Sequence, residues 1–278
     1  MKQVTELAYG KINLYLDVLG KRKDGYHNIK SVMQTVSLSD TVTVTEAETV
    51  SMTCSDPTLT CGEDNLCIQA ARVFFATYGR GGCHVHLNKT LPRQAGMGGG
   101  SADGAAVLRG LNRLYGEPFS LGDLCALGAK IGADVPFCVL GGGAALAEGI
   151  GEILSPFPSL PPCHLVVVGG KSKISTPKAY AVLDTLPSMG QGDFDAFAAA
   201  MKKGDLTAIG QTLYNRFEDA VPESQVILEH LLQNGACGAR MTGSGATVYG
   251  LFSDKPSAET ACLTLRRAGY TAVTATPV

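Results

Sequence analysis

The sequence lacks several features that would place it at once in a broad class. It has no surplus of positive charge: the formal net charge is −2 and 17% of the residues are charged. The broad basic surface that binding to a phosphate backbone requires is therefore missing. Met1 to Leu7 contain no apolar core of a signal peptide, and no later stretch has about eighteen uninterrupted apolar residues. We expect a cytoplasmic protein that binds neither nucleic acid nor membrane.

The nine cysteines also lack a pattern. They include no C-x-x-C pair, and an odd number cannot all be bridged within one chain, so we expect reduced thiols in the core. Glycine, by contrast, is in excess, since 34 of 278 residues is well above the average of roughly 7%. The glycines cluster, which indicates loops lined by backbone.

Two periodicities alternate along the first half of the chain. From Ile12 to Val18 apolar and polar residues alternate, which predicts a half-buried strand that ends at a turn over 23–25. The same alternation over 42–54, around a polar turn at 46–48, predicts an antiparallel hairpin, and 84–87 reads as a further short strand. Helical spacing predicts helices after Asn65, after Ser101 and over 121–131.

Prolines 156, 158, 161 and 162 crowd one short stretch, and we place a domain boundary there, between residues 158 and 159. Beyond it, strands are predicted at 165–168, 239–241, 247–252 and 271–275. Helices are predicted near 178–184, 194–201, 206–213, 226–232 and 257–268. Hairpins mixed with helices in this way favour an α+β fold over a doubly wound α/β sheet.

The densest signal is a glycine-rich segment between a predicted strand and a predicted helix. It reads Pro92-Arg93-Gln94-Ala95-Gly96-Met97-Gly98-Gly99-Gly100-Ser101-Ala102-Asp103. Glycines let successive amide groups approach an anion, and Ser101 is placed to cap a helix whose positive end points the same way. A flexible surface turn is the alternative, but four glycines in five residues directly before a helix disfavour it. We expect a nucleotide polyphosphate here.

The usual phosphate-binding fingerprints do not fit this chain. A dinucleotide-binding G-x-G-x-x-G starting at Gly96 fails because position 101 is serine. A Walker A motif ending at Lys171 and Ser172 fails because its first position, 165, is leucine. The glycine-rich segment therefore belongs to another kind of nucleotide site.

Two other loops have no assignable chemistry by themselves. Gly132-Ala133-Asp134-Val135-Pro136-Phe137 sets one carboxylate among small and apolar residues, and a lone aspartate is more often a helix cap or a turn former than a base. The loop Met241-Thr242-Gly243-Ser244-Gly245-Ala246-Thr247 lies between two predicted strands. It could be a tight hairpin with no further role.

Taken in order, these three loops and the opening Lys11-Ile12-Asn13 resemble the GHMP kinase superfamily along nearly the whole chain. Within it, residues 8–14 and the segment Lys23-Asp24-Gly25-Tyr26-His27 resemble the branch that phosphorylates a cytidine-diphosphate-linked methylerythritol. The chain departs from the usual pattern in two places: Tyr9-Gly10 stands where proline and alanine usually precede the lysine, and Ala102 where a second serine is common. Neither departure touches the chemistry.

The resemblance implies a fold and a set of site residues. The implied fold is a two-domain α+β architecture, with an N-terminal domain like ribosomal protein S5 domain 2 over 1–158, a ferredoxin-like C-terminal domain over 159–278, and the active site between them. The implied catalytic pair is Lys11 and Asp134, with ATP bound along the loop from Pro92 to Ala102. The residues implied near the substrate are Asn13, Tyr26, His27, Thr176 and Tyr180, with the two tyrosines on either side of the cytosine ring.

The implied reaction moves the γ-phosphoryl group of ATP to the 2-hydroxyl of the substrate, giving the 2-phosphate and ADP, in the non-mevalonate route to isoprenoid precursors. Asp134 would orient or deprotonate the hydroxyl, and Lys11 would hold that carboxylate ionised. Mg2+ is expected with ATP, mainly on phosphates and water, because no carboxylate cluster in the sequence forms an obvious cage. His84 and His86 share a strand face, but two histidines alone do not make a metal site.

Three alternatives stay open at this point. A sister kinase for a mevalonate-like, homoserine-like or sugar substrate would use the same machinery, although Tyr26-His27 favours a substrate that carries cytosine. A non-catalytic nucleotide-binding relative would share the fold, although the presence of both Lys11 and Asp134 argues against it. RNA binding by an S5-like domain lacks the basic charge it would need. The sequence gives no information about the oligomeric state.

Overall fold

The computed structural model describes residues 2–91, 96–170, 175–186 and 192–278. The chain forms two compact units, one from residues 2–10, 38–91 and 98–142, the other from 11–37, 96–97 and the described part of 143–278. The long strands β1 (Gln3–Lys21) and β2 (His27–Ala47) contribute residues to both units. The domain boundary between residues 158 and 159 was predicted from a proline-rich stretch, and it stays a prediction.

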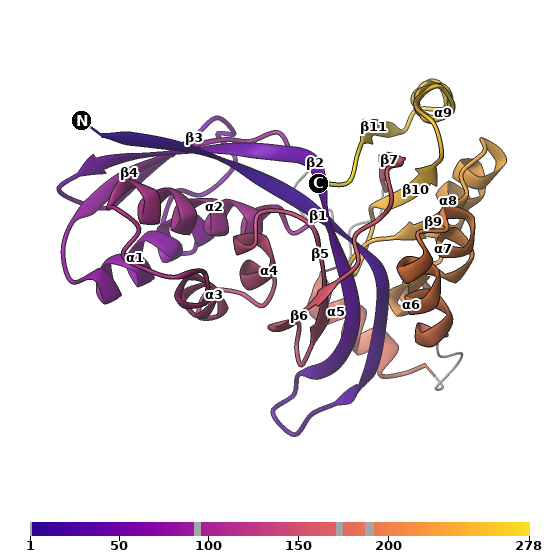
Figure 1. The fold of residues 1–278 in the computed structure, drawn as a ribbon, viewed down its shortest axis with the longest axis horizontal. Coiled ribbons are helices and arrows are strands. Elements are labelled where there is room, and N and C mark those ends of the chain that lie inside the picture. Colours follow the sequence, from indigo (N-terminus) through magenta and orange to yellow (C-terminus); the bar gives the residue numbers. More distant parts are fainter. Residues whose placement is uncertain (1, 92–95, 171–174, 187–191) are drawn as a thin grey trace. The chain divides into compact units, whose positions relative to one another are not determined.

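In the first unit, helices pack beside the outer strands of a sheet (Figure 1). Its further elements are β3 (Ser51–Cys54), α1 (Leu66–Tyr78), β4 (Gly82–Asn88), α2 (Gly99–Leu114), α3 (Leu121–Ala129) and α4 (Val135–Val139). Helices α1 and α2 pack on each other, and α4 contacts both α2 and α3. Helix α1 begins after Asn65, as predicted, because Asn65 Oδ1 accepts from Cys67 N over 2.9 Å, and it ends at Gly79, which adopts a left-handed φ of 90°.

The predicted hairpin over 42–54 is wrong. Strand β4 lies between β2 and β3, antiparallel to β2 and parallel to β3. At Gly82, where β4 begins, a Cβ would lie 2.7 Å from the backbone of Glu48 and Thr49, so only glycine lets β4 enter beside the turn after β2. Period-two alternation identified the two strands but carries no information about which strand pairs with which.

Strand β1 also differs from its prediction. The sequence predicts a half-buried strand at 12–18. In the structure, residues 10–17 are all buried, including their polar side chains. Asn13 and Tyr15 compensate by hydrogen bonding, through Asn13 Nδ2 to Ser31 Oγ over 2.8 Å and Tyr15 OH to the Gly192 carbonyl over 2.7 Å. The side chains of Asn13 and Tyr15 therefore take part in internal hydrogen bonds, where the sequence alternation suggested solvent.

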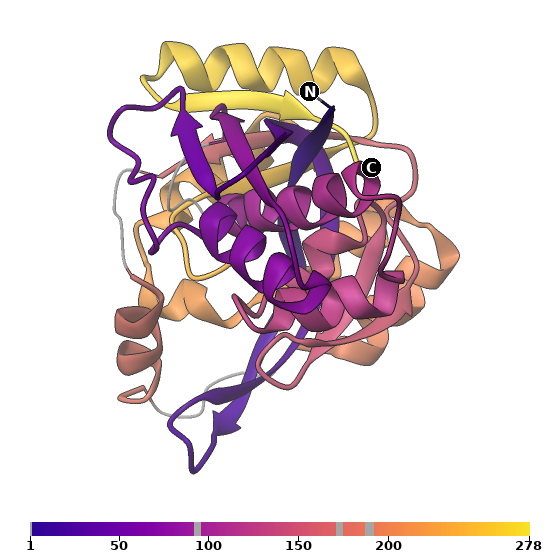
Figure 2. The same ribbon diagram turned by 90° about the vertical axis from the view of Figure 1, so that its left-hand side faces the viewer.

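The second unit contains a four-stranded antiparallel sheet in the order β11-β7-β10-β9. Its strands are β7 (His164–Gly169), β9 (Gly238–Met241), β10 (Val248–Phe252) and β11 (Thr271–Ala275), with α8 (Ser224–Gln233) and α9 (Lys255–Arg267) packed against them. Figure 2 shows α9 lying along β11. The β-α-β-β-α-β succession is that of a ferredoxin-like fold, as expected for the C-terminal part.

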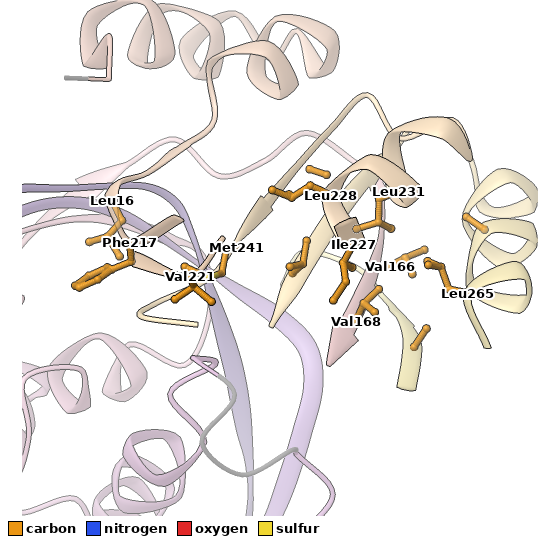
Figure 3. Close-up of a cluster of buried hydrophobic side chains, with 14 of the residues drawn as sticks. Leu16, Val166, Val168, Phe217, Val221, Ile227, Leu228, Leu231, Met241 and Leu265 are labelled. Carbon is orange, nitrogen blue, oxygen red and sulfur yellow. The ribbon is translucent and has the colours of Figure 1, made fainter. Parts of the chain in front are cut away.

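A hydrophobic cluster joins this sheet to its helices (Figure 3). Val166 and Val168, two residues apart on β7, contribute the same face of the strand. Ile227 and Leu231 of α8 and Leu265 of α9 belong to the same cluster, and all of these side chains are almost completely buried. Burying one such side chain contributes roughly 1.5–3 kcal/mol, so this cluster is a main source of stability for the unit.

The remaining elements of the second unit are short. They are β5 (Ala144–Glu148), β6 (Ile153–Phe157), α5 (Thr176–Leu183), α6 (Phe194–Lys203), α7 (Leu206–Thr212), β8 (Tyr214–Asn215) and a 3-10 turn η1 (Arg216–Ala220). Strand β5 pairs with β2 and β6, while β8 pairs with β1. Residues 276–278 hydrogen bond to 35–37 of β2. Within the described ranges, no helix is long and apolar enough to cross a membrane.

Candidate active site

The glycine-rich segment ends in the first turn of α2. The helix begins at Gly99, two residues before the predicted cap Ser101, because Gly98 takes the N-cap position with a left-handed φ of 67°. The helical ladder starts where Ala102 N donates to Gly98 O over 2.8 Å, so the amides of Gly99, Gly100 and Ser101 have no intrahelical acceptor. These amides lie at the positive end of the helix dipole, which suits an anion such as a polyphosphate.

The predicted nucleotide loop is only partly described. Pro92, Arg93, Gln94 and Ala95 lie outside the described residues. Gly96 has a φ of 70°, and a Cβ there would lie 2.2 Å from the Thr242 carbonyl oxygen, so only glycine fits. The start of the described loop is thus held directly against the third loop of the sequence.

Next to the start of α2, one ammonium group serves two buried carboxylates. Lys89 Nζ lies 2.5 Å from Asp40 Oδ2 and 2.8 Å from Asp103 Oδ2, and all three side chains are nearly completely buried. The other Asp40 oxygen accepts the amides of Thr90 and Leu91, over 2.5 and 2.7 Å, which anchors the chain that leads into the loop. A Cβ on Gly99 would come within 3.2 Å of Lys89 Nζ, so the glycine run borders this cluster.

Asp103, the last residue of the glycine motif, is the carboxylate of this cluster whose hydrogen bonding is incomplete. Its Oδ1 is buried and has no hydrogen-bond partner among the described residues. Burial raises the pKa of Asp103 to about 7, although the charge of Lys89 acts in the opposite direction. Removing one carboxylate from solvent next to another therefore makes this group sensitive to protons near neutral pH.

Asp134 stands in the N-cap position of α4 but does not cap it. Its side chain is half-buried and makes no capping hydrogen bond, and Pro136 occupies the first turn of the helix. In the same unit, Ser101 Oγ lies 3.9 Å from where a Cβ on Gly132 would be. The start of α2 and the segment that carries Asp134 are therefore neighbours, which puts a candidate anion site near a carboxylate.

Lys11 is a buried residue of β1 in the second unit. It is 4% exposed, which excludes a solvated surface lysine. Its Nζ donates to Asn13 Oδ1 over 2.7 Å, and its backbone amide donates to Met97 O of the glycine-rich segment over 2.9 Å. The lysine is thus fixed both at its backbone and at its charged end.

Asn13 is the centre of a buried hydrogen-bond network. It is 2% exposed, and its Oδ1 also accepts from Gly243 N over 3.0 Å. Its backbone nitrogen donates to Thr242 Oγ1 over 3.0 Å. Its backbone oxygen accepts from Tyr249 OH over 2.9 Å. Protein groups therefore use much of the polar capacity of this predicted substrate residue, and substrate binding by Asn13 stays a prediction.

The residues predicted around the cytosine lie near the hairpin between β1 and β2. His27 is nearly buried, stacks on Tyr180 of α5, and places Nε2 2.8 Å from Asp184 Oδ1. Because an ionised carboxylate only accepts, Nε2 carries a proton. Hydrogen bonds from Lys21 and His27 lower the pKa of Asp184 and keep it ionised. Tyr26 is 61% exposed at the end of the hairpin.

Thr176, the last predicted substrate residue, begins helix α5. Its Oγ1 lies 2.9 Å from Ser244 Oγ in the turn between β9 and β10. The third loop of the sequence is therefore in contact with Thr176 through Ser244 and with Gly96 through Thr242.

Each unit thus gathers part of the predicted site. The first brings together the start of α2, Ser101 and the segment of Asp134; the second brings together Lys11, Asn13 and Gly96, and separately His27 and Tyr180. The pairing of Lys11 with Asp134 joins residues of both units and stays a prediction.

Sequence reasoning missed several residues that organise the site. Thr242 lies inside a loop that had been singled out, but nothing in its spacing indicated contacts with Asn13 and Gly96. Asp184 is 157 residues from His27, so no local pattern could have joined them. Lys89 lies two residues after a predicted strand, and only the closeness of two aspartates from other segments gives it a role.

Two family models match the chain. The GHMP kinases N terminal domain matches residues 65–142, and the GHMP kinases C terminal model matches residues 186–271. The first match contains Asp134 and the glycine run that starts at Gly98, and the second contains the loop from Met241 to Thr247.

Curated relatives are similar over almost the full length. The 4-diphosphocytidyl-2-C-methyl-D-erythritol kinase of Lachnoclostridium phytofermentans is 40% identical, over 91% of this chain and 89% of its own length. The enzyme of the same name from Desulfitobacterium hafniense is 38% identical, over 96% of this chain and 93% of its own length.

Solved structures show how widely the fold is shared. A crystal structure of 4-(cytidine 5'-diphospho)-2C-methyl-D-erythritol kinase superposes with a TM-score of 0.80 at 31% identity, over 99% of both chains. A homoserine kinase from Cytophaga hutchinsonii superposes almost as well, with a TM-score of 0.79 at 17% identity over 100% of this chain and 95% of its own. The fold alone therefore does not select between these substrates.

Proposed function

The chain belongs to the GHMP kinases, in the family of 4-diphosphocytidyl-2-C-methyl-D-erythritol kinases, and we propose that it transfers the γ-phosphoryl group of ATP to the 2-hydroxyl of 4-diphosphocytidyl-2-C-methyl-D-erythritol. The products are the 2-phosphate and ADP, and the reaction lies on the non-mevalonate route to isoprenoid precursors. One observation carries the choice of substrate: the chain is 38–40% identical, over nearly its full length, to relatives of that name.

ATP binding is supported by the backbone at the start of α2. Three successive amides, of Gly99, Gly100 and Ser101, have no intrahelical acceptor and lie at the positive helix end. The absence of side chains at Gly98 to Gly100 leaves this backbone open to close approach by phosphate oxygens. The triphosphate is proposed to lie along residues 92–102, with its γ-phosphate toward the segment of Asp134.

The chemistry assigned to the side chains is alignment and charge stabilisation. Asp134 accepts a hydrogen bond from the substrate hydroxyl and takes its proton as the oxygen attacks phosphorus in line. The Lys11 ammonium is assigned to offset the negative charge that grows on the transferred group. The position of Lys11 needs little adjustment before reaction, because Asn13 Oδ1 and the Met97 carbonyl already hold it.

Magnesium is proposed to come with the nucleotide. Over the ranges that the structure describes, no group of three or more histidine, cysteine, aspartate or glutamate side chains is arranged to hold a metal ion. We therefore assign Mg2+ mainly to phosphate oxygens and water, the ligands that this hard cation prefers, and we assign no step to a metal held by the protein. We also propose that the reaction takes place in the cytoplasm.

A substrate panel tests this function against the sister kinases. Purified protein with ATP is offered 4-diphosphocytidyl-2-C-methyl-D-erythritol, mevalonate, homoserine and galactose in separate assays, and ADP release is followed. We expect turnover with the first acceptor only. Turnover with another acceptor, or with none, would contradict the proposal, and the second result would favour a non-catalytic nucleotide-binding protein.

A further inference from the structure

Thr242 lies at a junction between three parts of the second unit. Its side chain is completely buried in the turn between β9 and β10. Its Oγ1 accepts from the backbone amide of Asn13 over 3.0 Å, and its single proton lies between two acceptors, Asn13 Oδ1 and the Gly96 carbonyl oxygen, each 3.2 Å away. One hydroxyl thus contacts the strand of Lys11 and the glycine-rich segment at the same time.

The network fixes which way the Asn13 amide points. Ser31 Oγ donates its only proton to the Tyr15 carbonyl over 2.8 Å, so it must accept from Asn13 Nδ2. Asn13 Oδ1 is therefore the atom that faces Lys11 Nζ, which can only donate. The ammonium group thus has one acceptor in this network whose orientation is set by other residues.

Thr242 and Gly243 hold that acceptor from the other side. Gly243 N donates to Asn13 Oδ1 over 3.0 Å, and the Thr242 hydroxyl approaches the same oxygen. The backbone of Thr242 also touches Gly96 so closely that a Cβ on Gly96 would lie 2.2 Å from the Thr242 carbonyl oxygen. A displacement of Thr242 would therefore move the support of Lys11 and the support of the glycine-rich segment together.

We propose that Thr242 is a positioning residue for Lys11. Thr242 acts through the Asn13 amide and links the position of the Lys11 ammonium group to the glycine-rich segment at Gly96. This inference rests on the proposed function, because it assumes that Lys11 takes part in phosphoryl transfer. Thr242 itself touches neither reactant in this role.

The test removes the hydroxyl and keeps the shape. Thr242→Val leaves Asn13 N without its acceptor and Asn13 Oδ1 without one of its donors, so the Asn13 amide that holds Lys11 Nζ is less firmly positioned. We expect kcat to fall roughly tenfold to a hundredfold, the range in which a small misplacement of a catalytic group acts. Thr242→Ser keeps the hydroxyl and should hold kcat within about twofold of the wild type.

Tyr249→Phe is the matched control. It also removes one buried hydroxyl that bonds to Asn13, but at the backbone oxygen, away from the amide that holds Lys11. We expect a lower thermal unfolding temperature for Tyr249→Phe and for Thr242→Val, and a large loss of kcat only for Thr242→Val. An equal loss of kcat in both variants would show general loosening and overturn the proposal.

A double-mutant cycle with Lys11→Met decides whether Thr242 acts through the lysine. We expect Lys11→Met to lower kcat strongly, and Thr242→Val to change kcat by less than about twofold when added to it. If Thr242→Val costs as much in the Lys11→Met background as in the wild type, the positioning role is wrong while the function stands. If Lys11→Met retains near wild-type kcat, the catalytic assignment of Lys11 and this inference both fall.

Discussion

His27 stacks on Tyr180 with ring centroids 4.5 Å apart and 13° between the planes, while its Nε2 donates to Asp184 over 2.8 Å. The imidazole is therefore fixed on one face and at one edge. The expected placement of Tyr26 and Tyr180 on either side of a cytosine stays a prediction, and in the structure the ring stacked on Tyr180 is that of His27. A base that binds here has to meet an imidazole whose orientation is already set.

That fixed orientation predicts base selectivity. We expect the wild type to use the cytidine substrate with a kcat/KM at least about a hundredfold above that of its uridine analogue, because a site built for one hydrogen-bond pattern is left mispaired by the other. His27→Ala and Asp184→Ala should both reduce this ratio, the second by releasing the imidazole. Lys21→Met is the control, because Lys21 is 56% exposed and pairs with Asp184 Oδ2, whereas His27 bonds to Oδ1. Equal use of both substrates by the wild type would remove the case for cytosine recognition.

For Asp134→Asn we expect ATP binding to persist while kcat falls by roughly a hundredfold or more, the usual value of a general base. The variant keeps the shape of the side chain, and α4 loses no cap because Asp134 makes no capping bond. Asp123→Asn serves as the control, because Asp123 is an exposed carboxylate of the α3 capping box. Its expected effect is on stability alone. Near wild-type turnover by Asp134→Asn would rule out the assigned role.

Two glycines in equivalent positions test the phosphate site. Gly100 and Gly122 are each the second residue of a helix, α2 and α3, and a Cβ on either would meet its nearest side chain at ordinary contact distance, 3.6 and 3.8 Å. Both valine variants should therefore fold. Gly100→Val should raise the KM for ATP several-fold because its branched side chain crowds the amides proposed to bind phosphate, whereas Gly122→Val should leave KM unchanged. Unaltered ATP binding by Gly100→Val would place the triphosphate elsewhere.

The raised pKa of Asp103 predicts a pH dependence of stability. Between its ordinary pKa of 3.8 and the folded value of about 7, the folded protein binds a proton that the unfolded chain does not. The contribution of Asp103 to the free energy of unfolding should therefore be highest below pH 3.8 and should fall as the pH rises to about 7. Urea unfolding of the wild type and of Asp103→Asn at several pH values measures this as the difference between the two proteins. If the free energy of unfolding of the wild type instead rose with pH relative to that of Asp103→Asn, the ion pair with Lys89 would outweigh the cost of burial.

Local signals predicted the elements that have local causes. Asn65 and Gly79 bound α1 through contacts within a few residues, and Lys11 and Asn13, two residues apart on one strand, share a face as spacing requires. The start of α2 was misplaced because Gly98, with no side chain to signal a cap, ends the loop through its backbone conformation.

What the sequence could not predict depends on long-range pairing. The strand that lies next to β3 is β4, which follows it after the whole of helix α1, and alternation in β2 and β3 gives no sign of this. Likewise, Thr242 reaches Asn13 across 229 residues, and Lys89 finds Asp40 across 49. These contacts are fixed by the packing of the whole fold, so residue types and spacings alone could name the motifs but not the network that joins them.

The interleaving of the two units limits how such a chain can be cut or exchanged. The second unit takes residues 11–37 from near the N-terminus, and its strand β5 pairs with that part of β2 while β8 pairs with that part of β1. A gene fragment that begins at residue 143 would encode β5 and β8 without these partners. A single recombination crossover between two relatives would combine strands of one parent with their neighbours from the other. We therefore expect functional chimaeras of this family to need at least two crossovers, which carry the hairpin of β1 and β2 together with the C-terminal half.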